Sequence, residues 1–183
     1  MYFILKVALT LQGFYHRPNM MNTISIREIS VTDNEALAKI IRQSLVDFKA
    51  NKPGTVYFDP TTDNLFEIFK TPGSIYFVAI QDGQLLGGGG LFPTPNLPAG
   101  TCELVKLYLN AGARGKGIGK LLMEKCFEAA KKLGYKNIYL ETMPELKIAV
   151  PMYEKMGFTY LNAPQGNSGH GGCDIWMIKD LGH

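Results

Sequence analysis

The chain has 183 residues, of which 46% are hydrophobic and 19% charged, and its formal net charge is +3. That length supports one domain with a sizeable core, and the small, dispersed charge argues against a nucleic-acid groove or a polybasic membrane patch. The three cysteines, Cys102, Cys126 and Cys173, are odd in number and show no metal-site spacing, which indicates buried free thiols in a reducing cytoplasm.

The first 20 residues differ from the rest of the chain. The apolar run MYFILKVALTLQGF is shorter than the roughly 20 residues that a membrane span needs. A signal peptide would have more positive charge before its apolar core and a small-residue cleavage site, and neither feature is clear here. We therefore expect residues 1–20 to be an extension and residues 21–183 to form a single domain.

Hydrophobic periodicity and turn residues divide the rest of the chain into strands and helices. Asp33 and Thr62 are expected to cap helices, and Pro144 is expected to begin one. In chain order, the predicted elements are a strand at 23–29, helices at 34–46 and 63–70, strands at 74–80, 85–92 and 101–109, a helix at 117–133, a strand at 137–142, a helix at 144–157, and strands at 158–161 and 173–181. Mixed hairpin and crossover connections of this kind predict an α/β domain with a mixed sheet.

A glycine-rich segment, LNAGARGKGIGKLL at 109–122, separates a predicted strand from a predicted helix. A P-loop would need a glycine where the chain has Arg114 and a hydroxyl where it has Leu121. A dinucleotide-binding fingerprint beginning at Gly117 would need a glycine in place of Leu122. Both nucleotide-binding motifs are therefore disfavoured.

The pattern that remains is Arg-x-x-Gly-x-Gly, formed by Arg114, Gly117 and Gly119. Free amides and the dipole at a helix N-terminus favour an anion such as a pyrophosphate. Glycines also let the backbone approach it closely. Taken alone, the pattern also fits a tight turn with solvated basic residues.

Two longer segments help to decide between an anion-binding loop and a simple tight turn. Together they resemble the GNAT superfamily of N-acetyltransferases. The segments are ELVKLYLNAGARGKGIGKLLMEKC at 103–126 and NIYLETMPELKIAVPMYEKMGF at 137–158. The first segment is similar to the acyl-CoA-binding motif, and the second to the strand and helix that follow it. The resemblance extends over roughly 24–181. It implies a mixed, mostly antiparallel central sheet with splayed strands, flanked by helices, and acetyl-CoA as the co-substrate.

The resemblance also implies where acetyl-CoA binds. The pantetheine arm would lie along the strand before the glycine loop, at Leu107, Tyr108 and Leu109. The pyrophosphate would rest on the loop, at Arg114, Gly115, Lys116, Gly117, Ile118, Gly119 and Lys120.

Two side chains are catalytic candidates by the same resemblance. Tyr153 would protonate the sulfur of the leaving CoA, since a phenol titrates at about 10. Glu103 would accept the proton of the amine, directly or through water, which needs a raised pKa or a water chain. Strand alternation places Glu103, Val105 and Leu107 on one side of the sheet, and it predicts a solvated Lys106 on the other.

The chain departs from the family pattern at two positions. Leu146 stands where many family members have an asparagine that bonds the pantetheine. Pro151 lies inside the predicted last helix, where it is expected to crowd the carbonyl of Lys147 and kink the helix just before Tyr153.

The acceptor side is less constrained by the sequence. The family places the loop before the last strand over the acceptor pocket, and His170 in that loop is either an acceptor-binding group or a surface histidine. Tyr57 and Asp59 are the polar candidates on the opposite wall. Four glycines at 87–90 form either a weak, twisted strand or a flat floor that lets a ligand or backbone come close.

The expected activity is direct transfer of an acetyl group from acetyl-CoA to a primary amine of a small-molecule or amino-acid-like acceptor, without a metal. Transfer of a longer acyl group stays open, as does an acyl-CoA-binding sensor or interaction module without turnover. The expected partner is the small-molecule amine, with no nucleic acid and no membrane. A homodimer is possible.

Overall fold

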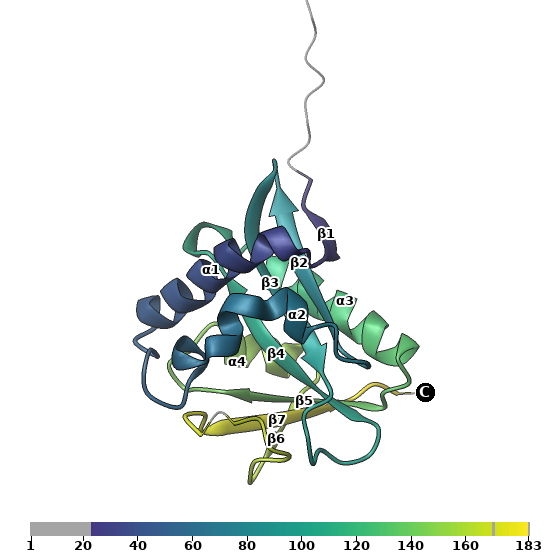
Figure 1. Ribbon diagram of the computed structural model, residues 1–183. Helices are drawn as coiled ribbons and strands as arrows, with labels where there is room; N and C mark the ends of the chain where they lie inside the picture. Colours follow the sequence, from purple (N-terminus) through teal and green to yellow (C-terminus); the bar gives the residue numbers. More distant parts are fainter. Residues whose placement is uncertain (1–22, 170, 183) are drawn as a thin grey trace, which may run out of the picture.

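The computed structural model describes residues 23–169 and 171–182. A seven-stranded sheet lies at its centre (Figure 1). The strands are β1 (Ser25–Glu28), β2 (Ile75–Gln81), β3 (Gln84–Phe92), β4 (Thr101–Leu109), β5 (Asn137–Thr142), β6 (Thr159–Leu161) and β7 (Ile175–Asp180). Their order across the sheet is β1-β2-β3-β4-β5-β7-β6, and in this part of the chain the parallel neighbours are β4 and β5. The predicted mixed, mostly antiparallel sheet is confirmed. The predicted extension at 1–20 lies outside the described residues.

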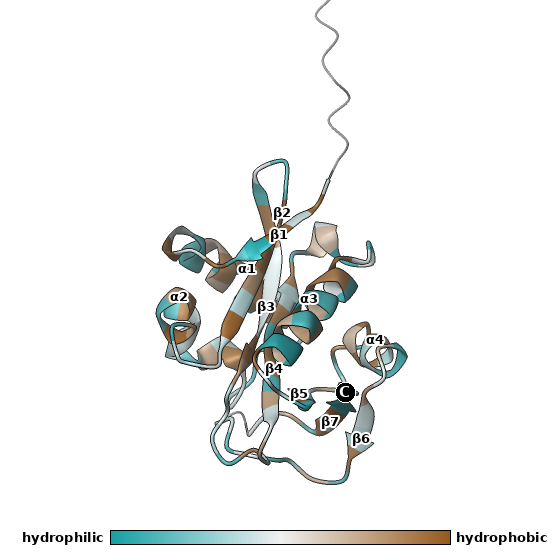
Figure 2. Ribbon diagram, turned by 90° about the vertical axis from the view of Figure 1, so that its right-hand side faces the viewer, coloured by the Kyte–Doolittle hydropathy of each residue, from teal (hydrophilic) through white to brown (hydrophobic). Residues whose placement is uncertain are grey.

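The helices cover both faces of this sheet (Figure 2). The helices are α1 (Asn34–Asp47), α2 (Leu65–Ile68), α3 (Ile118–Lys132) and α4 (Ala149–Lys155). Helices α1 and α2 lie on one face, where Leu37 and Ile41 pack with Tyr76, and α3 lies on the other, where Leu122 and Cys126 enter the larger apolar cluster. Burial of such side chains stabilises the fold by roughly 1.5–3 kcal/mol each.

Strands β4 and β5 begin side by side and then separate. Thr101–Glu103 pairs with Asn137–Tyr139, and the pairing stops there although both strands continue. The rest of β4 therefore presents its backbone groups along an edge that β5 leaves open. The predicted splay of the two strands is confirmed.

A bulge at Lys106 changes which side chains of β4 share a face. Gly88 pairs with Tyr108 and Gly90 with Val105, so two residues of β4 stand opposite one residue of β3. Lys106 has a φ of 51°, in the left-handed region. Beyond the bulge the alternation is shifted. Leu107 therefore packs with the α3 cluster, not on the side of Glu103, and the prediction for Leu107 was wrong.

The four glycines of β3 make room for neighbouring side chains. A Cβ on Gly88 or Gly90 would lie 2.6 Å from the ring of Tyr76, and one on Gly89 would lie 2.6 Å from Leu107. The hydroxyl of Tyr76 donates to the carbonyl of Lys106 at 2.8 Å, which ties the ring to the bulge. A Cβ on Gly87 would clash with the backbone carbonyl of Tyr108. The close approach that these glycines were expected to allow is thus made by both side chains and backbone of the protein.

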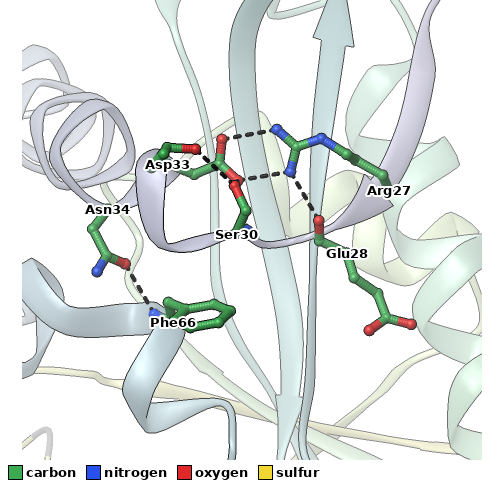
Figure 3. Close-up of polar contacts among 7 residues, drawn as sticks. Arg27, Glu28, Ser30, Asp33, Asn34 and Phe66 are labelled. Carbon is green, nitrogen blue, oxygen red and sulfur yellow. Dashed lines mark hydrogen bonds and ion pairs between the residues drawn. The ribbon is translucent and has the colours of Figure 1, made fainter.

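The turn from β1 into α1 is held by Asp33 (Figure 3). Asp33 occupies the predicted N-cap position of α1 but makes no side-chain bond to that helix. Its carboxylate accepts hydrogen bonds from Arg27 at 2.7 and 2.9 Å and from the amide of Ser30 at 2.7 Å. The side chain of Asn34 then accepts from the amide of Phe66 at 2.9 Å, which joins α1 to α2.

The segment before α2 also begins differently from the prediction. A 3-10 helix, Pro60–Asn64, precedes α2, and Asp59 caps it by accepting from the amide of Thr61 at 2.8 Å. Thr62, the predicted cap, is buried, and its hydroxyl donates to the carbonyl of Val56 at 3.1 Å.

Helix α4 is shorter than predicted. It begins at Ala149 and not at Pro144, so Pro151 falls in its first turn. The amides of a first turn have no partner within the helix, so proline is tolerated there without a kink. The predicted distortion ahead of Tyr153 was therefore wrong.

Candidate active site

The first of three cavities that form the site lies beside the glycine loop. We call it the loop cavity. It has a volume of about 570 Å³ and is bounded by the end of β4, the start of α3, α4 and the end of α1. Its lining includes Ser44, Phe48, Leu107, Tyr108, Leu109, Arg114, Gly115, Gly117, Gly119, Lys120, Leu146, Pro151, Met152 and Tyr153.

The glycine loop presents backbone to this cavity. Gly115 and Gly117 have φ values of 74° and 80°, which favour glycine, and Gly117 is the N-cap of α3. The first amides of α3 lack partners within the helix, and the helix dipole adds partial positive charge at that end. The loop therefore offers backbone amides and partial positive charge of the kind that suits an anion.

Arg114 fastens the loop to α1. Its Nε donates to the carbonyl of Leu109 at 3.0 Å, and its Nη2 donates to Ser44 at 3.0 Å and to Asp47 at 2.8 Å. The guanidinium also lies 4.8 Å from the ring centre of Phe48. Arg114 thus lines the cavity while its charge is paired with Asp47.

Tyr153 reaches the loop cavity from α4. Only 6% of the residue is exposed, and its ring lies 5.9 Å from that of Phe158. Burial raises the pKa of the Tyr153 phenol well above its usual range, and the neighbouring Cys173 adds to this effect. The phenol therefore keeps its proton at neutral pH.

A second cavity, of about 510 Å³, lies on the α1 and α2 side of β4. We call it the carboxylate cavity. Asp59, Glu103 and Lys106 give it its charge, and Phe58, Phe69 and Phe92 give it an aromatic wall. Its other lining residues include Thr61, Thr94, Val105, Asn167 and Ser168.

Glu103 is the buried acid of this cavity. Only 3% of it is exposed, and the hydroxyl of Thr94 donates to its Oε2. Burial raises the pKa of the Glu103 carboxyl to about 7, and the charge of Glu141 acts in the same direction, against the opposing effects of Thr94 and Lys106. Such a group is a base of suitable strength at neutral pH.

Lys106 is the buried cation of the cavity, and the prediction that it is solvated was wrong. Its side chain is 6% exposed, and its Nζ lies 2.7 Å from Oδ2 of Asp59. Burial alone would raise the pKa of Asp59, but hydrogen bonds from Lys106 and Thr61 outweigh it and hold that pKa well below its usual range. The bulge explains the placement, because it puts Lys106 and Glu103 in the same cavity.

A small third cavity of about 50 Å³, the junction, touches both of the others. Tyr108 and Leu146 line the junction and the loop cavity, while Glu103, Val105 and Lys106 line the junction and the carboxylate cavity. A continuous set of side chains thus leads from the glycine loop to Glu103.

Glu141, Thr142 and Cys173 also line the junction. Glu141 accepts hydrogen bonds from Tyr139 at 2.8 Å and from Ser168 at 2.9 Å. Burial raises the pKa of the Cys173 thiol to about 12. The buried hydroxyl of Thr142 has no hydrogen-bond partner among residues 23–169 and 171–182.

Most of the residues singled out from the sequence meet at these cavities. Of the predicted acetyl-CoA contacts, Lys116 is exposed and Ile118 is buried in the core, and neither lines the loop cavity. Asp59 lines the carboxylate cavity, whereas Tyr57 packs against the α1 cluster and the neighbouring Phe58 lines the cavity. His170 lies outside the described residues.

Several residues that line the site were not predicted from the sequence. Thr94 lies in a proline-rich loop, and Glu141 and Ser168 are 27 residues apart in the chain yet share a hydrogen bond. Nothing in the local sequence pairs these residues, because long-range contacts bring them together. A bulge at Lys106 has no signal in the alternating pattern of β4.

Comparison with known proteins identifies the class to which this fold and site belong. The family model described as "Acetyltransferase (GNAT) family" matches residues 39–158. The N-acetyltransferase YjgM of Escherichia coli (strain K12), itself uncharacterized, is 37% identical over 158 residues, which is 85% of this chain and 94% of YjgM. The chain therefore belongs to the GNAT acetyltransferase family and is an N-acetyltransferase.

Solved structures agree on the fold. A GNAT-family acetyltransferase from Staphylococcus aureus Mu50 superposes with a TM-score of 0.77 at 22% identity, covering 87% of this chain and 100% of that one. The PaiA N-acetyltransferase of Thermoplasma acidophilum, crystallised with coenzyme A, has a TM-score of 0.68 at 24% identity and covers 86% and 99%.

Over residues 23–169 and 171–182, no set of three or more His, Cys, Asp and Glu side chains is placed to hold a metal ion. In the same ranges, no helix has both the length and the apolar character that a membrane crossing demands.

Proposed function

We propose that the protein transfers an acetyl group from acetyl-CoA to a primary amine of a small-molecule or amino-acid-like acceptor in one direct step. The observation that carries this proposal is the junction, which shares lining residues with both larger cavities. A donor in the loop cavity and an acceptor in the carboxylate cavity would meet there, close to Glu103.

Acetyl-CoA would be held mainly by backbone groups. The loop amides and the start of α3 suit its pyrophosphate. The open edge of β4, at Leu107 to Leu109, offers amides and carbonyls to the pantetheine arm. Leu146, which lines the loop cavity in place of the family's asparagine, supplies only apolar contact.

The proton movements follow from the environments of two side chains. Glu103 would take a proton from the acceptor ammonium, and the neutral amine would attack the acetyl carbonyl. As the carbon–sulfur bond breaks, the departing thiolate would take the hydroxyl proton of Tyr153, which burial keeps protonated. The nitrogen would lose its second proton as the amide forms, and Tyr153 would regain a proton by way of solvent, so that the step balances. Cys173 is poorly suited to an acyl-enzyme route, because its raised pKa keeps it a thiol.

Two measurements test this function. Isothermal titration with acetyl-CoA and with CoA tests the donor site, and thiol release over a library of amines tests turnover. We expect both acetyl-CoA and CoA to bind and at least one amine to accelerate thiol release. Binding without any amine-dependent thiol release would support a non-catalytic module. Thiol release only with longer acyl-CoA donors would show that the transferred group is a longer acyl group and not acetyl.

A conservative substitution tests the proposed acid. Tyr153→Phe should lower kcat by about 100-fold, the lower end of general acid catalysis, with little change in acetyl-CoA affinity. Tyr160→Phe is the matched control, because that hydroxyl is exposed and bonds Glu154 away from the cavities. Full turnover in Tyr153→Phe would show that another group protonates the sulfur.

A further inference from the structure

The ammonium of Lys106 is a cation held inside the carboxylate cavity. Only 6% of its side chain is exposed, and Asp59 is its one hydrogen-bond partner among the described residues. A lysine ammonium has three donors, and buried polar groups are generally bonded. Donors beyond the one given to Asp59 can therefore face a ligand.

Asp59 fixes the position of this ammonium. Its carboxylate accepts from Nζ of Lys106 at 2.7 Å, from the amide of Thr61 at 2.8 Å and from the hydroxyl of Thr61 at 2.7 Å. With its oxygens bonded in this way, Asp59 acts as an anchor that holds Lys106 in place. A second carboxylate, brought by a ligand, would form charge-assisted hydrogen bonds with the remaining donors.

The bulge in β4 sets Lys106 beside the proposed base. Glu103 and Lys106 both line the carboxylate cavity and the junction, and their charges interact. A ligand that satisfies both must carry an amine and an anionic group close together. An α-amino acid does so, because the same carbon bears its amine and its carboxylate.

One part of the cavity wall is apolar, although Thr61, Thr94, Asn167 and Ser168 also line the cavity. The rings of Phe69 and Phe92 meet edge to face with centres 5.8 Å apart, and Phe58 is 60% exposed where it lines the cavity. Ile68 and Val105 add aliphatic surface. A side chain placed against this wall gains from leaving water only if it is itself apolar.

We propose that the acceptor is an α-amino acid with an apolar side chain, whose carboxylate binds Lys106 while its amine faces Glu103. This inference rests on the proposed function and names the acceptor class of the same site. Lys106 is then the specificity-determining residue, with Asp59 as the residue that positions it.

Matched acceptors test the need for a carboxylate. Thiol release from acetyl-CoA is measured with leucine, methionine and phenylalanine, with their carboxamides, and with isoamylamine and phenethylamine, which lack the carboxylate. We expect kcat/KM for the acids to exceed that for the amides and amines by about 10- to 100-fold, mainly through KM. Aspartate and lysine should be poorer acceptors than leucine.

Two variants test the assignment to Lys106. Lys106→Met should reduce the preference for acid over amide to under about threefold. Because this change leaves Asp59 buried without its partner, Lys106→Met combined with Asp59→Asn removes both charges and guards against misfolding. Lys39→Met, at an exposed ion pair with Glu35 on α1, is the control and should keep the preference.

The outcomes separate this inference from the proposed function. Equal turnover of acids and amides would overturn the inference and leave the acetyltransferase function standing. A preference for acids that persists in both Lys106 variants would overturn the role of Lys106. Acetyl-CoA binding without thiol release for any of these acceptors would overturn the inference for this class and count against turnover itself.

Discussion

The loop cavity and the carboxylate cavity are built in different ways. The loop cavity takes much of its lining from one short stretch, 107–120, and presents mainly backbone and apolar side chains. The carboxylate cavity takes its lining from segments as distant as Gly54 and Gly169, and its polar groups are side chains. A common donor can thus be held by backbone geometry, while the acceptor is selected by side chains that can change without disturbing the donor.

The largest expected effect separates the two cavities most sharply. Glu103→Gln should lower kcat by about 100- to 10,000-fold while acetyl-CoA affinity stays unchanged, because the proposed base lies in the proposed acceptor cavity. In the unmodified protein a plot of kcat/KM against pH should rise with a midpoint near pH 7. The variant should lack this rise. Glu67→Gln, an exposed carboxylate on α2, is the control. An unchanged pH profile in Glu103→Gln would remove Glu103 from the role.

The same residue predicts a dependence of stability on pH. The folded pKa of about 7 lies above the usual value of 4.5, so the folded state holds this proton more tightly than the unfolded state. The stabilisation is complete below about pH 4.5 and is lost as pH rises through 7, by roughly 3 kcal/mol. Urea unfolding at several pH values should show this loss. Glu103→Gln should lack it, and a loss of equal size in that variant would assign it elsewhere.

The bulge that both cavities share should respond to Tyr76→Phe. The carbonyl of Lys106 would lose its hydrogen bond, at a cost of about 1–2 kcal/mol in the free energy of unfolding. Turnover should also fall, because the peptide between Lys106 and Leu107 is less well fixed. Tyr135→Phe, which removes a similar bond to the carbonyl of Gly73, should cost stability without affecting kinetics. Equal losses of turnover in both variants would assign the kinetic effect to general destabilisation and not to the bulge.

The smallest expected effect falls on the donor side alone. Gly117→Ala would force an alanine to adopt a φ of 80°, at a cost of about 1–2 kcal/mol, although nothing lies within 4 Å of the added Cβ. Acetyl-CoA affinity should weaken by about fivefold as the loop amides shift. Gly134→Ala, with a φ of 84° and open space at the other end of α3, should match the stability loss and spare the affinity. A weaker affinity in both variants would point to general destabilisation.

The family and the order of the elements could be predicted from the sequence. Strands β4 and β5 match the predicted ranges, because their boundaries are marked by nearby turn residues. Helix α4 was predicted too long, since a proline opens a helix equally well at Pro144 or in a first turn that holds Pro151. Local rules of this kind state which structures are allowed, and packing selects among them.

The proposed anion-binding role of the glycine loop could be argued from the sequence, because such a role depends on backbone conformation, which glycines and a helix N-terminus set locally. The acceptor side was decided by tertiary structure. One bulge in β4 turned Lys106 from an expected surface residue into a buried partner of Asp59, 47 residues away in the chain. Strand pairing and loop packing likewise place the hydroxyl of Thr94 in hydrogen-bond contact with Glu103 and bring the charge of Glu141 near enough to affect it. Contacts between charged residues that are far apart in the sequence depend on strand register and on where neighbouring strands separate. A local sequence pattern contains no information about either.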